Sequence, residues 1–297
     1  MRHIRFNTRH RDTLIGLFFV APFLIGAAVF FMYPLLSSLL LSFGDTDQSR
    51  GGFHIVLGGL SHYYEAFLGS TQFVPLLLGE LKRTAFETPL ILVFSLLLAI
   101  MLNRVGRLRG FFRVILLLPF LLGTGEVMKQ LLSQNIDTQI INIAGGDLIP
   151  RDFLLYLGAD IVSALDSMFG VIVKVLWNSG VQTLLFLSAI QSISPALYES
   201  AKMDGANEYE QFWKITLPMT SQVLLLNLIY TIINSFTDSS NTVLEHIQNQ
   251  TVAQAKFGYA AALGWIYFAL ILLILGAVGL IFGLYARKNQ TIGRNLK

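Results

Sequence analysis

Cysteine is absent from this chain, and charged residues are scarce. Asp, Glu, Lys and Arg together make up 13% of its 297 residues, whereas soluble domains carry roughly 25%. Without cysteine the chain forms no disulfide, has no catalytic thiolate and offers no Cys-ligated metal site. The five histidines are scattered, with no HExxH or paired spacing, so the sequence predicts no metal site.

Sequence motifs of enzymes are also missing. No Gly-x4-Gly-Lys-[Ser/Thr] phosphate loop occurs, so any ATP hydrolysis has to come from another polypeptide. No Gly-x-Ser-x-Gly occurs either, and residues 144–147 (Ala-Gly-Gly-Asp) only approach the Gly-x-Gly-Asp pattern of an intramembrane enzyme. We find no internal repeat and no deeply placed acid, both of which are typical of ion-coupled secondary transporters. The sequence therefore predicts no catalytic residues, and an ion-coupled transporter or an intramembrane enzyme is kept as the alternative.

Long apolar runs dominate what is present. Hydrophobic residues make up 54% of the chain, and the mean hydropathy is +0.62. A helix needs about 20 mostly apolar residues to cross a bilayer. Six stretches meet or nearly meet that length: 13–40, 84–102, 112–132, 166–190, 220–237 and 258–285. The sequence therefore predicts an all-α polytopic membrane protein with six transmembrane helices.

Proline and local polarity give expectations for the segments in and around these spans. Pro22 and Pro34 are expected to kink or end the first span. The aromatic and glycine-rich stretch 44–83 is expected outside, either as a surface loop or as a docking surface for an external receptor. Residues 150–165 are expected to form an interfacial or short re-entrant piece. No targeting peptide is evident, because the apolar run after the basic residues 1–12 is far longer than a signal-peptide core.

The distribution of Lys and Arg predicts which ends of the spans face the cytoplasm. With the N-terminus inside, 14 of the 21 Lys and Arg residues lie in inner segments and 5 lie in outer segments. The remaining two, Lys129 and Lys174, lie within predicted spans. Because positively charged loops stay in the cytoplasm, both termini and the loops 103–111 and 191–219 are predicted to be cytoplasmic.

Cysteine labelling tests this topology, since any introduced cysteine is unique in the chain. A cysteine at Ser200 or at Asn289 is expected to be protected from an impermeant thiol reagent in intact cells. A cysteine at Ser49 is expected to react. Labelling of position 200 from outside would overturn the orientation and the functional inferences that depend on it.

A polar segment, residues 194–219, separates the predicted fourth and fifth spans. Ser194-Pro195 is a helix start, with serine as N-cap and proline at the first helical position. Asp204-Gly205 is expected to end that helix, because glycine readily takes the left-handed conformation at a helix terminus. Asn207 followed by Glu210 resembles a capping box that starts a second helix, and Thr216-Leu217-Pro218 is expected to stop it. The segment therefore predicts two short helices bent at a glycine, with an ordinary solvated loop as the alternative.

The same segment carries a spaced pattern of residues. It reads Glu199-Ser200-Ala201, then three residues to Gly205, then nine residues to Ile215-Thr216-Leu217-Pro218. This pattern resembles the cytoplasmic coupling loop of the membrane subunits of type I binding-protein-dependent ABC importers, which reads Glu-Ala-Ala, Gly and Ile-x-Leu-Pro at the same spacing. Ser200 in place of alanine is the one departure. The resemblance assigns ATPase coupling to eight residues: Glu199, Ser200, Ala201, Asp204, Gly205, Ile215, Leu217 and Pro218.

The resemblance also implies a fold, partners and a location. It covers about 79–285 and is similar in detail to the carbohydrate-importing branch, for example in Gly258-Tyr259-Ala260-Ala261-Ala262. It implies one transmembrane permease domain, 1–297, with the type I importer fold: 1–78 as basic N-terminus, first span and outer loop, 79–285 as core, and 286–297 as cytoplasmic tail. The expected partners are a second permease subunit, two ATP-binding subunits, an extracellular solute-binding protein and the bilayer. The second permease subunit is usually a different chain, and the ATP-binding subunits hold ATP and Mg. No nucleic acid is expected as a partner. The chain itself is expected to need no cofactor, to be a transport subunit rather than an enzyme, and to lie in the bacterial cytoplasmic (inner) membrane.

Polar side chains within the predicted spans mark a candidate path for a sugar or oligosaccharide. On the fifth span they recur at intervals of three and four, which places them on one helical face. The candidate path comprises Trp177, Asn178, Asn227, Tyr230, Asn234, Thr237, Asp238 and Asn241. Amides, hydroxyls and aromatic faces suit a polyol or sugar; the alternative is hydrogen bonding between helices, worth about 1 kcal/mol each. Glu87 is expected at the membrane interface, because it lies one turn from the start of its predicted span.

Overall fold

The computed structural model describes residues 8–47, 54–104, 110, 114, 175–238 and 241–295. The predicted third span apart from residue 114, the predicted interfacial piece 150–165 and the first part of the fourth span lie outside the described residues. The chain divides into two compact units, Met1–Leu77 with Val243–Leu270, and Leu78–Thr242 with Ile271–Lys297. The single permease domain inferred from the sequence stays a prediction.

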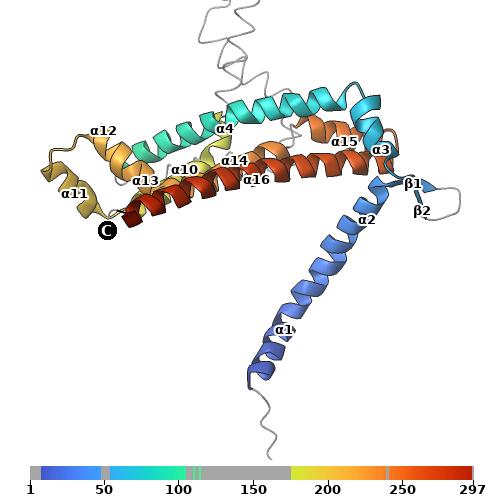
Figure 1. Ribbon diagram of the computed structural model, residues 1–297, viewed down its shortest axis with the longest axis horizontal. Helices are drawn as coiled ribbons and strands as arrows, with labels where there is room; N and C mark the ends of the chain where they lie inside the picture. The colour runs from blue at the N-terminus through green and yellow to red at the C-terminus, as the bar shows by residue number, and fades with distance from the viewer. Residues whose placement is uncertain are drawn as a thin grey trace, which may run out of the picture. The chain divides into compact units, whose positions relative to one another are not determined.

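The first unit begins with a long apolar helix. α1 (Thr8–Ala27), the π-helix η1 (Ala28–Met32) and α2 (Tyr33–Ser42) follow one another without a break (Figure 1). Neither Pro22 nor Pro34 ends the helix. The π-turn lies directly before Pro34, where the backbone N–H of Tyr33 donates to the carbonyl of Ala28. This wider turn accommodates the missing N–H and the ring of the proline, so the predicted first span is one continuous helix.

A short β-hairpin, which the sequence did not predict, follows α2 in the otherwise helical part of the chain that the structure describes. β1 (Gly44–Asp47) pairs antiparallel with β2 (His54–Leu57), with Gly44 opposite Leu57. The backbone N–H of Gly58 donates to the carbonyl of Phe43 at 2.8 Å and continues the pairing. α3 (Ser61–Tyr64) and the π-helix η3 (Glu65–Gly69) come next. All other regular elements in the described residues are helical, so the predicted outer loop 44–83 is largely regular structure.

α4 (Phe73–Arg104) begins well before residue 84, the predicted start of the second span. The polar run from Glu80 to Glu87 lowers the local hydropathy, but most of its residues are good helix formers. Glu80 is 2% exposed and Glu87 is 7% exposed. Glu87 lies about four turns into the helix, so the expectation that it lies one turn from the helix start is wrong.

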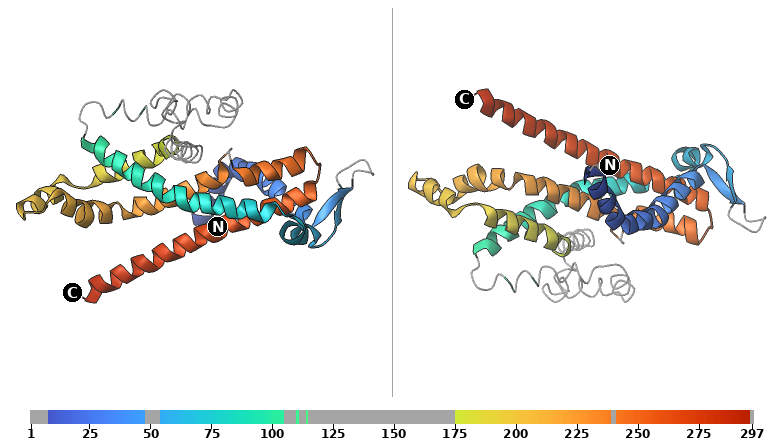
Figure 2. Two further views of the ribbon diagram at one scale, coloured as in Figure 1. Left: turned by 90° about the horizontal axis from the view of Figure 1, so that it is seen from above. Right: turned by 90° about the horizontal axis from the view of Figure 1, so that it is seen from below.

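The second unit holds the polar segment between two of its helices. α10 (Gly180–Ser192) leads into α11 (Pro195–Met203), and α12 (Glu208–Gln211), η4 (Phe212–Thr216) and α13 (Leu217–Met219) lead into α14 (Ser221–Thr237). The chain bends by 65° between α10 and α11 and by 67° between α13 and α14. Both views of Figure 2 show the yellow and light orange elements projecting together beyond the paired ends of α10 and α14.

An apolar cluster packs α10 and α14 against the C-terminal half of α4. Its buried members are Ala99, Leu102, Phe186, Leu187 and Ile190, and the half-buried side chains of Val223 and Leu224 pack on them. Between helices of a membrane protein such contacts stabilise through van der Waals packing rather than through removal of the side chains from water. The cluster therefore fixes the helices from which the polar segment projects.

Two further helices complete the described part of the chain. They are α15 (Thr242–Val252) and α16 (Phe257–Asn295). In the first unit, the indole N–H of Trp265 donates to Ser38 Oγ at 3.3 Å and joins α16 to α2.

Three helices in the described residues are long and apolar enough to cross a membrane: Ile15–Ser42, Phe73–Arg104 and Phe257–Leu284. The number rises to five if each bent helix pair, 180–203 and 208–252, forms one span. The protein is therefore polytopic, and the count of six spans stays a prediction.

Candidate functional site

The polar segment 194–219, here named the coupling segment, begins as the sequence predicts. Ser194 has an extended backbone, with φ −61° and ψ 128°, and Pro195 occupies the first turn of α11. The serine side chain makes no capping hydrogen bond. The helix start therefore depends on the fixed φ of the proline and on its missing N–H, which needs no partner at this position.

Gly205 ends α11 in a Schellman turn. Its φ is +82°, in the left-handed region that glycine enters without steric cost. Its backbone N–H donates to the carbonyl of Lys202 at 3.0 Å, and that of Ala206 donates to the carbonyl of Ala201 at 2.9 Å. These two bonds satisfy carbonyls at the end of the helix. A Cβ at Gly205 would meet no atom within 4 Å, so the need for glycine is conformational rather than steric.

Asn207 starts α12 with a complete capping box. The Glu210 N–H donates to Asn207 Oδ1 at 2.8 Å, and the Asn207 N–H donates to Glu210 Oε2 at 3.0 Å. The backbone hydrogen bond from Asn207 and the nearby Lys214 ammonium hold the pKa of Glu210 below its ordinary value of 4.5. The associated stabilisation is therefore present above pH 4.5 and is lost as the pH falls through the lowered pKa.

The second helical piece ends at Met219, one residue after the predicted stop at Thr216-Leu217-Pro218, but Leu217 keeps helical dihedral angles. The π-helix η4 lies directly before Leu217 and Pro218, and its wider turn accommodates a proline inside a helix. The bend comes at Thr220 instead. Its Oγ1 donates to the carbonyl of Thr216 at 2.9 Å, and such a bond within one turn tends to bend a helix.

Two hydrogen bonds brace the coupling segment from within. Tyr198 Oη and Thr216 Oγ1 lie 2.9 Å apart and join α11 to η4. Gln211 Nε2 donates to the carbonyl of Ala206 at 2.9 Å. No periodicity or motif points to either contact, because both depend on how the chain turns at Gly205. Together they hold the two helical arms as one unit.

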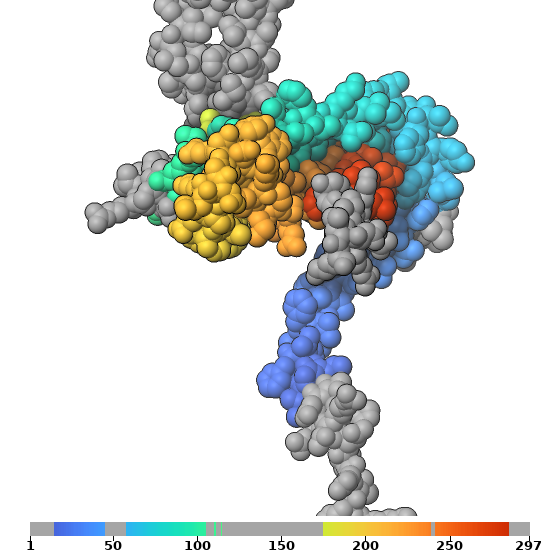
Figure 3. All heavy atoms as spheres, turned by 60° about the vertical axis from the view of Figure 1, so that its left-hand side comes forward, coloured from blue at the N-terminus to red at the C-terminus, as the bar shows by residue number. Residues whose placement is uncertain are grey.

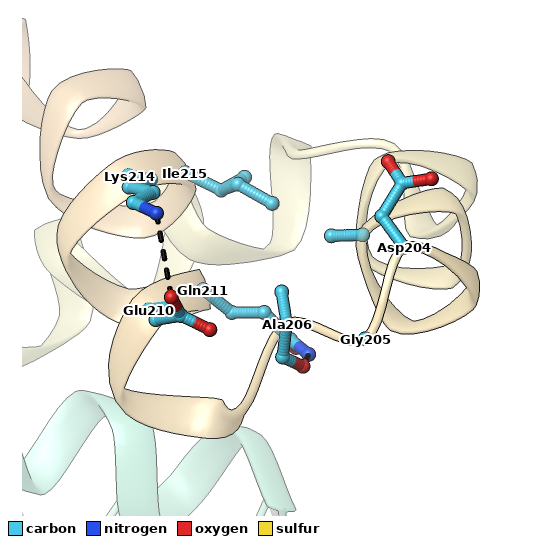
Figure 4. A pocket seen from close by; sticks show the side chains of 8 residues that line it. Asp204, Gly205, Ala206, Glu210, Gln211, Lys214 and Ile215 are labelled. Atoms are coloured by element: carbon cyan, nitrogen blue, oxygen red, sulfur yellow. Dashed lines mark hydrogen bonds and ion pairs between the residues drawn. The ribbon is translucent and has the colours of Figure 1, made fainter.

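A pocket of about 440 Å³ opens between the two arms. Four of the residues predicted for coupling line it, namely Ala201, Asp204, Gly205 and Ile215. In Figure 4, Asp204 lies on the α11 side, across the pocket from Glu210 and Lys214, whose Oε1 and Nζ are 3.4 Å apart. The other four predicted residues do not line the pocket: Glu199 and Ser200 are exposed on α11, and Leu217 and Pro218 lie in α13.

The outer surface of the coupling segment is apolar for a loop between helices. The Met203 side chain is 89% exposed, Tyr209 is 70% exposed and Trp213 is 49% exposed. Figure 3 shows the segment, in gold, as a compact lobe at the surface. The Tyr209 and Trp213 rings pack edge to face with centroids 6.1 Å apart, and exposed apolar side chains of this kind are typical of an interaction surface.

Buried polar side chains join α4, α10 and α14. Thr84 Oγ1 and Ser235 Oγ lie 2.8 Å apart, and Gln182 Nε2 donates to Thr231 Oγ1 at 3.0 Å. Asn227 Nδ2 donates to the carbonyl of Gln182 at 3.2 Å. Asn227, Thr231 and Ser235 are 0%, 1% and 8% exposed, so the structure places Asn227 in a helix–helix contact.

The other residues of the predicted path have different surroundings. Asn241 is buried, and its Nδ2 donates to the carbonyl of Phe236 at 3.3 Å, which caps the end of α14. Among the rest, Tyr230, Asn234, Asp238, Trp177 and Asn178 are half-buried, and Thr237 is exposed. The structure thus separates the predicted stripe into a buried edge and a half-exposed face, formed by Tyr230, Asn234 and Thr237.

Sequence reasoning missed the α4 side of the polar contact. Glu80, Thr84 and Thr88 recur every four residues on α4 and are 2%, 4% and 4% exposed. This spacing identifies one helical face, and Glu80 joins Thr84 and Thr88 on it only when the helix is started at Phe73. Within the described residues, no group of three or more His, Asp or Glu is arranged to hold a metal ion.

Comparison with known proteins identifies the family. Residues 89–290 match the family described as binding-protein-dependent transport system inner membrane component. The chain belongs to this family. It is therefore a multi-pass inner-membrane permease subunit of a binding-protein-dependent ABC importer, and the resemblance found in the coupling segment is confirmed.

Relatives match over nearly the whole chain. The probable ABC transporter permease protein YesP of Bacillus subtilis (strain 168) is 27% identical over 292 residues, covering 91% of this chain and 90% of that protein. The arabinooligosaccharides transport system permease protein AraP of the same organism is 28% identical, covering 86% of this chain and 84% of that protein. A chain of a bacterial alginate ABC transporter, crystallised with an alginate pentasaccharide-bound periplasmic protein, aligns with a TM-score of 0.64 and 18% identity, covering 92% of this chain and 95% of that chain. The fold is therefore that of an ABC importer permease.

Proposed function

We propose that the permease imports a sugar or oligosaccharide as part of a complex with a second permease subunit, two ATP-binding subunits and an external solute-binding protein. The names of the relatives support this solute class, since AraP transports arabinooligosaccharides and the solved transporter imports alginate. ATP and Mg are assigned to the ATP-binding subunits, so the permease itself needs no cofactor. Six spans with both termini in the cytoplasm complete the proposal.

The coupling segment is the proposed contact surface for the ATP-binding subunits. One observation carries this assignment: a rigid, bent unit, fixed by Gly205 and internal hydrogen bonds, presents exposed apolar side chains. Met203 and Tyr209 lie at its outer surface. Burial of a methionine or aromatic side chain against a partner is worth about 1.5–3 kcal/mol, which favours a stable protein contact over a solvated loop.

The solute path is assigned to the half-exposed face of α14. On this face, a phenol ring, an amide and a hydroxyl that are not buried between helices come from Tyr230, Asn234 and Thr237. Trp177, Asn178 and Asp238 are half-buried as well and extend the candidate set. Such groups bind sugar hydroxyls and the apolar face of a sugar ring.

Purification through a tag on the permease tests the coupling assignment. Met203→Asp is expected to reduce the amount of ATP-binding subunit that co-purifies by roughly tenfold, because a charge would replace a buried apolar contact. The side chain is 89% exposed, so the fold of the free permease is expected to persist. Met203→Leu is the matched control and is expected to retain the ATP-binding subunits. Equal recovery with aspartate and with leucine would contradict the assignment.

Uptake by the reconstituted complex tests the solute class. Arabinotriose is a neutral probe and an alginate trisaccharide is an acidic one. We expect ATP-dependent uptake of at least one of these two probes, or of a related oligosaccharide that competes with them. Failure of a broad set of carbohydrates to be taken up or to stimulate ATP hydrolysis would contradict the proposal.

A further inference from the structure

An ion pair joins the coupling segment to α4. Arg104 is the last residue of α4, and Glu208 is the first residue of α12. Arg104 Nη2 donates to Glu208 Oε2 at 2.8 Å, across 104 positions of the chain. Among the ion pairs between described residues, this one ties the coupling segment to a helix outside it.

Both partners of the ion pair are held in place by their helices. Arg104 is the last residue of α4 before the undescribed residues 105–109. Glu208 directly follows Asn207, whose capping box with Glu210 fixes this turn. The hydrogen bond and charge of Arg104, with a smaller effect of Lys202, hold the pKa of Glu208 below its ordinary value of 4.5. Glu208 is therefore ionised at neutral pH.

The ion pair crosses a hollow between α4 and the coupling segment. A pocket of about 310 Å³ lies here, and its lining is part polar and part apolar. It is lined by Ile100, Asn103 and Arg104 of α4, Ile190 of α10, and Tyr198, Lys202, Glu208, Gln211, Phe212 and Thr216 of the coupling segment. The Arg104 side chain is 65% exposed and the Glu208 side chain is 75% exposed. Ile100 and Ile190, which belong to the apolar cluster, form part of the same lining, so the ion pair lies beside that cluster. Apolar packing of Ala99 and Leu102 therefore holds this part of α4 against α10, and the solvent-exposed ion pair adds a direct link from α4 to α12.

The chain itself connects the coupling segment to α10 and α14 but not to α4. α11 follows α10 across the 65° bend, and α14 follows α13 across the 67° bend. A displacement of the segment therefore reaches α10 and α14 through the backbone. It reaches the end of α4 through side-chain contacts, while Thr84 and Ser235 keep α4 tied to α14 further along the helix.

We propose that Arg104 and Glu208 are positioning residues for transport, which make the end of α4 follow the coupling segment when the ATP-binding subunits move it. This inference rests on the proposed contact between the coupling segment and those subunits. An exposed ion pair contributes little to stability. Its loss is therefore expected to leave the fold and the bound ATP-binding subunits intact, and to separate ATP hydrolysis from solute movement.

Charge reversal tests the ion pair. The variants are Arg104→Glu, Glu208→Arg and the double variant, which restores the opposite charges in exchanged positions and is the matched control. Each complex is reconstituted, and uptake of arabinotriose or the alginate trisaccharide, whichever the unmodified complex imports, is measured per ATP hydrolysed. Each single reversal is expected to lower this ratio roughly fivefold or more. The double variant is expected to return it to within about twofold of the original value.

The possible outcomes separate the ion pair from other roles. Unchanged ratios in both single variants, or a loss that the double variant does not restore, would overturn the proposal. A lowered melting temperature with an unchanged ratio would reduce the pair to a stabilising contact and would overturn it as well. If a reversal lowers the yield of complex, Arg104→Gln and Glu208→Gln are measured in the same way, with a smaller expected loss.

If the proposed function is wrong, the experiments give a different result from the one expected if only the ion-pair proposal is wrong. The unmodified complex would then contain no ATP-binding subunit, or Met203→Asp would leave that subunit bound. Either result removes the basis of the ion-pair proposal before any charge is reversed. When the ATP-binding subunits are present and Met203→Asp reduces their recovery, the uptake per ATP hydrolysed decides the role of Arg104 and Glu208.

Discussion

Replacement of Gly205 by valine is expected to release the ATP-binding subunits and to abolish transport. The backbone at this position has φ +82°, which costs a β-branched residue about 1–3 kcal/mol. The chain relieves this cost by turning differently between α11 and α12. The bonds that Gly205 and Ala206 donate to Lys202 and Ala201 would then be lost. Met203 and Trp213, which lie on opposite sides of this turn, would no longer share one rigid surface.

Asparagine at the same position is the matched control. Apart from glycine, asparagine is among the residue types that most readily enter the left-handed region. Because a Cβ at position 205 meets no atom within 4 Å, asparagine and valine differ in backbone preference rather than in fit. Gly205→Asn is therefore expected to retain most of the ATP-binding subunit in the tagged complex. Equal recovery with valine and with asparagine, at equal yield of inserted permease, would show that the left-handed turn is not required.

The coupling segment is the part of the fold that the sequence predicts best, because its signals act over a few residues. Ser194-Pro195, Gly205 and the pair Asn207 and Glu210 each impose a backbone geometry that follows from local stereochemistry. The contacts that stiffen and anchor the segment are not local. Tyr198 and Thr216 are 18 positions apart, and Arg104 and Glu208 are 104 apart. Such pairs are brought together by the fold, and no spacing rule identifies them.

Errors in the predicted elements share a physical origin. Pro34 does not end its helix and Pro218 does not force Leu217 out of helical geometry, because a π-turn before each provides the space that the ring needs. The start of α4 was placed too late, because hydropathy measures suitability for lipid whereas helix formation depends on backbone preference. The strand pairing of Gly44 with Leu57 likewise depends on a return of the chain that composition does not reveal.

Periodicity identified the polar face of α14 but not its two environments. Asn227 and Asn234 lie on the same predicted stripe, seven positions apart. Which part of a stripe is buried depends on the neighbouring helices, and Thr84 of α4 and Gln182 of α10 occupy only one edge of it. The same residue type therefore stands in a packed contact at one position and on a half-exposed face at the other.

Alanine at Asn227 and alanine at Asn234 are therefore expected to give opposite results. Asn227 is fully buried and donates to the carbonyl of Gln182, and its Oδ1 has no partner among the described residues. Loss of this single bond within a membrane is expected to cost about 0.6–1.7 kcal/mol. Asn227→Ala should lower the melting temperature of the complex and leave the relative uptake of different solutes unchanged.

Asn234→Ala is expected to leave the melting temperature unchanged and to alter solute uptake. Its side chain is half-buried and makes no hydrogen bond to another described residue, so the fold loses little when it is removed. A hydrogen bond to a neutral hydroxyl of the solute is worth about 0.5–1.5 kcal/mol, which corresponds to a several-fold fall in uptake rather than its abolition. Uptake across a set of oligosaccharides and the melting temperature are measured on the same reconstituted variant. Normal uptake with a lowered melting temperature for Asn234→Ala would assign this residue to packing, and the half-exposed face of α14 would then not be the path.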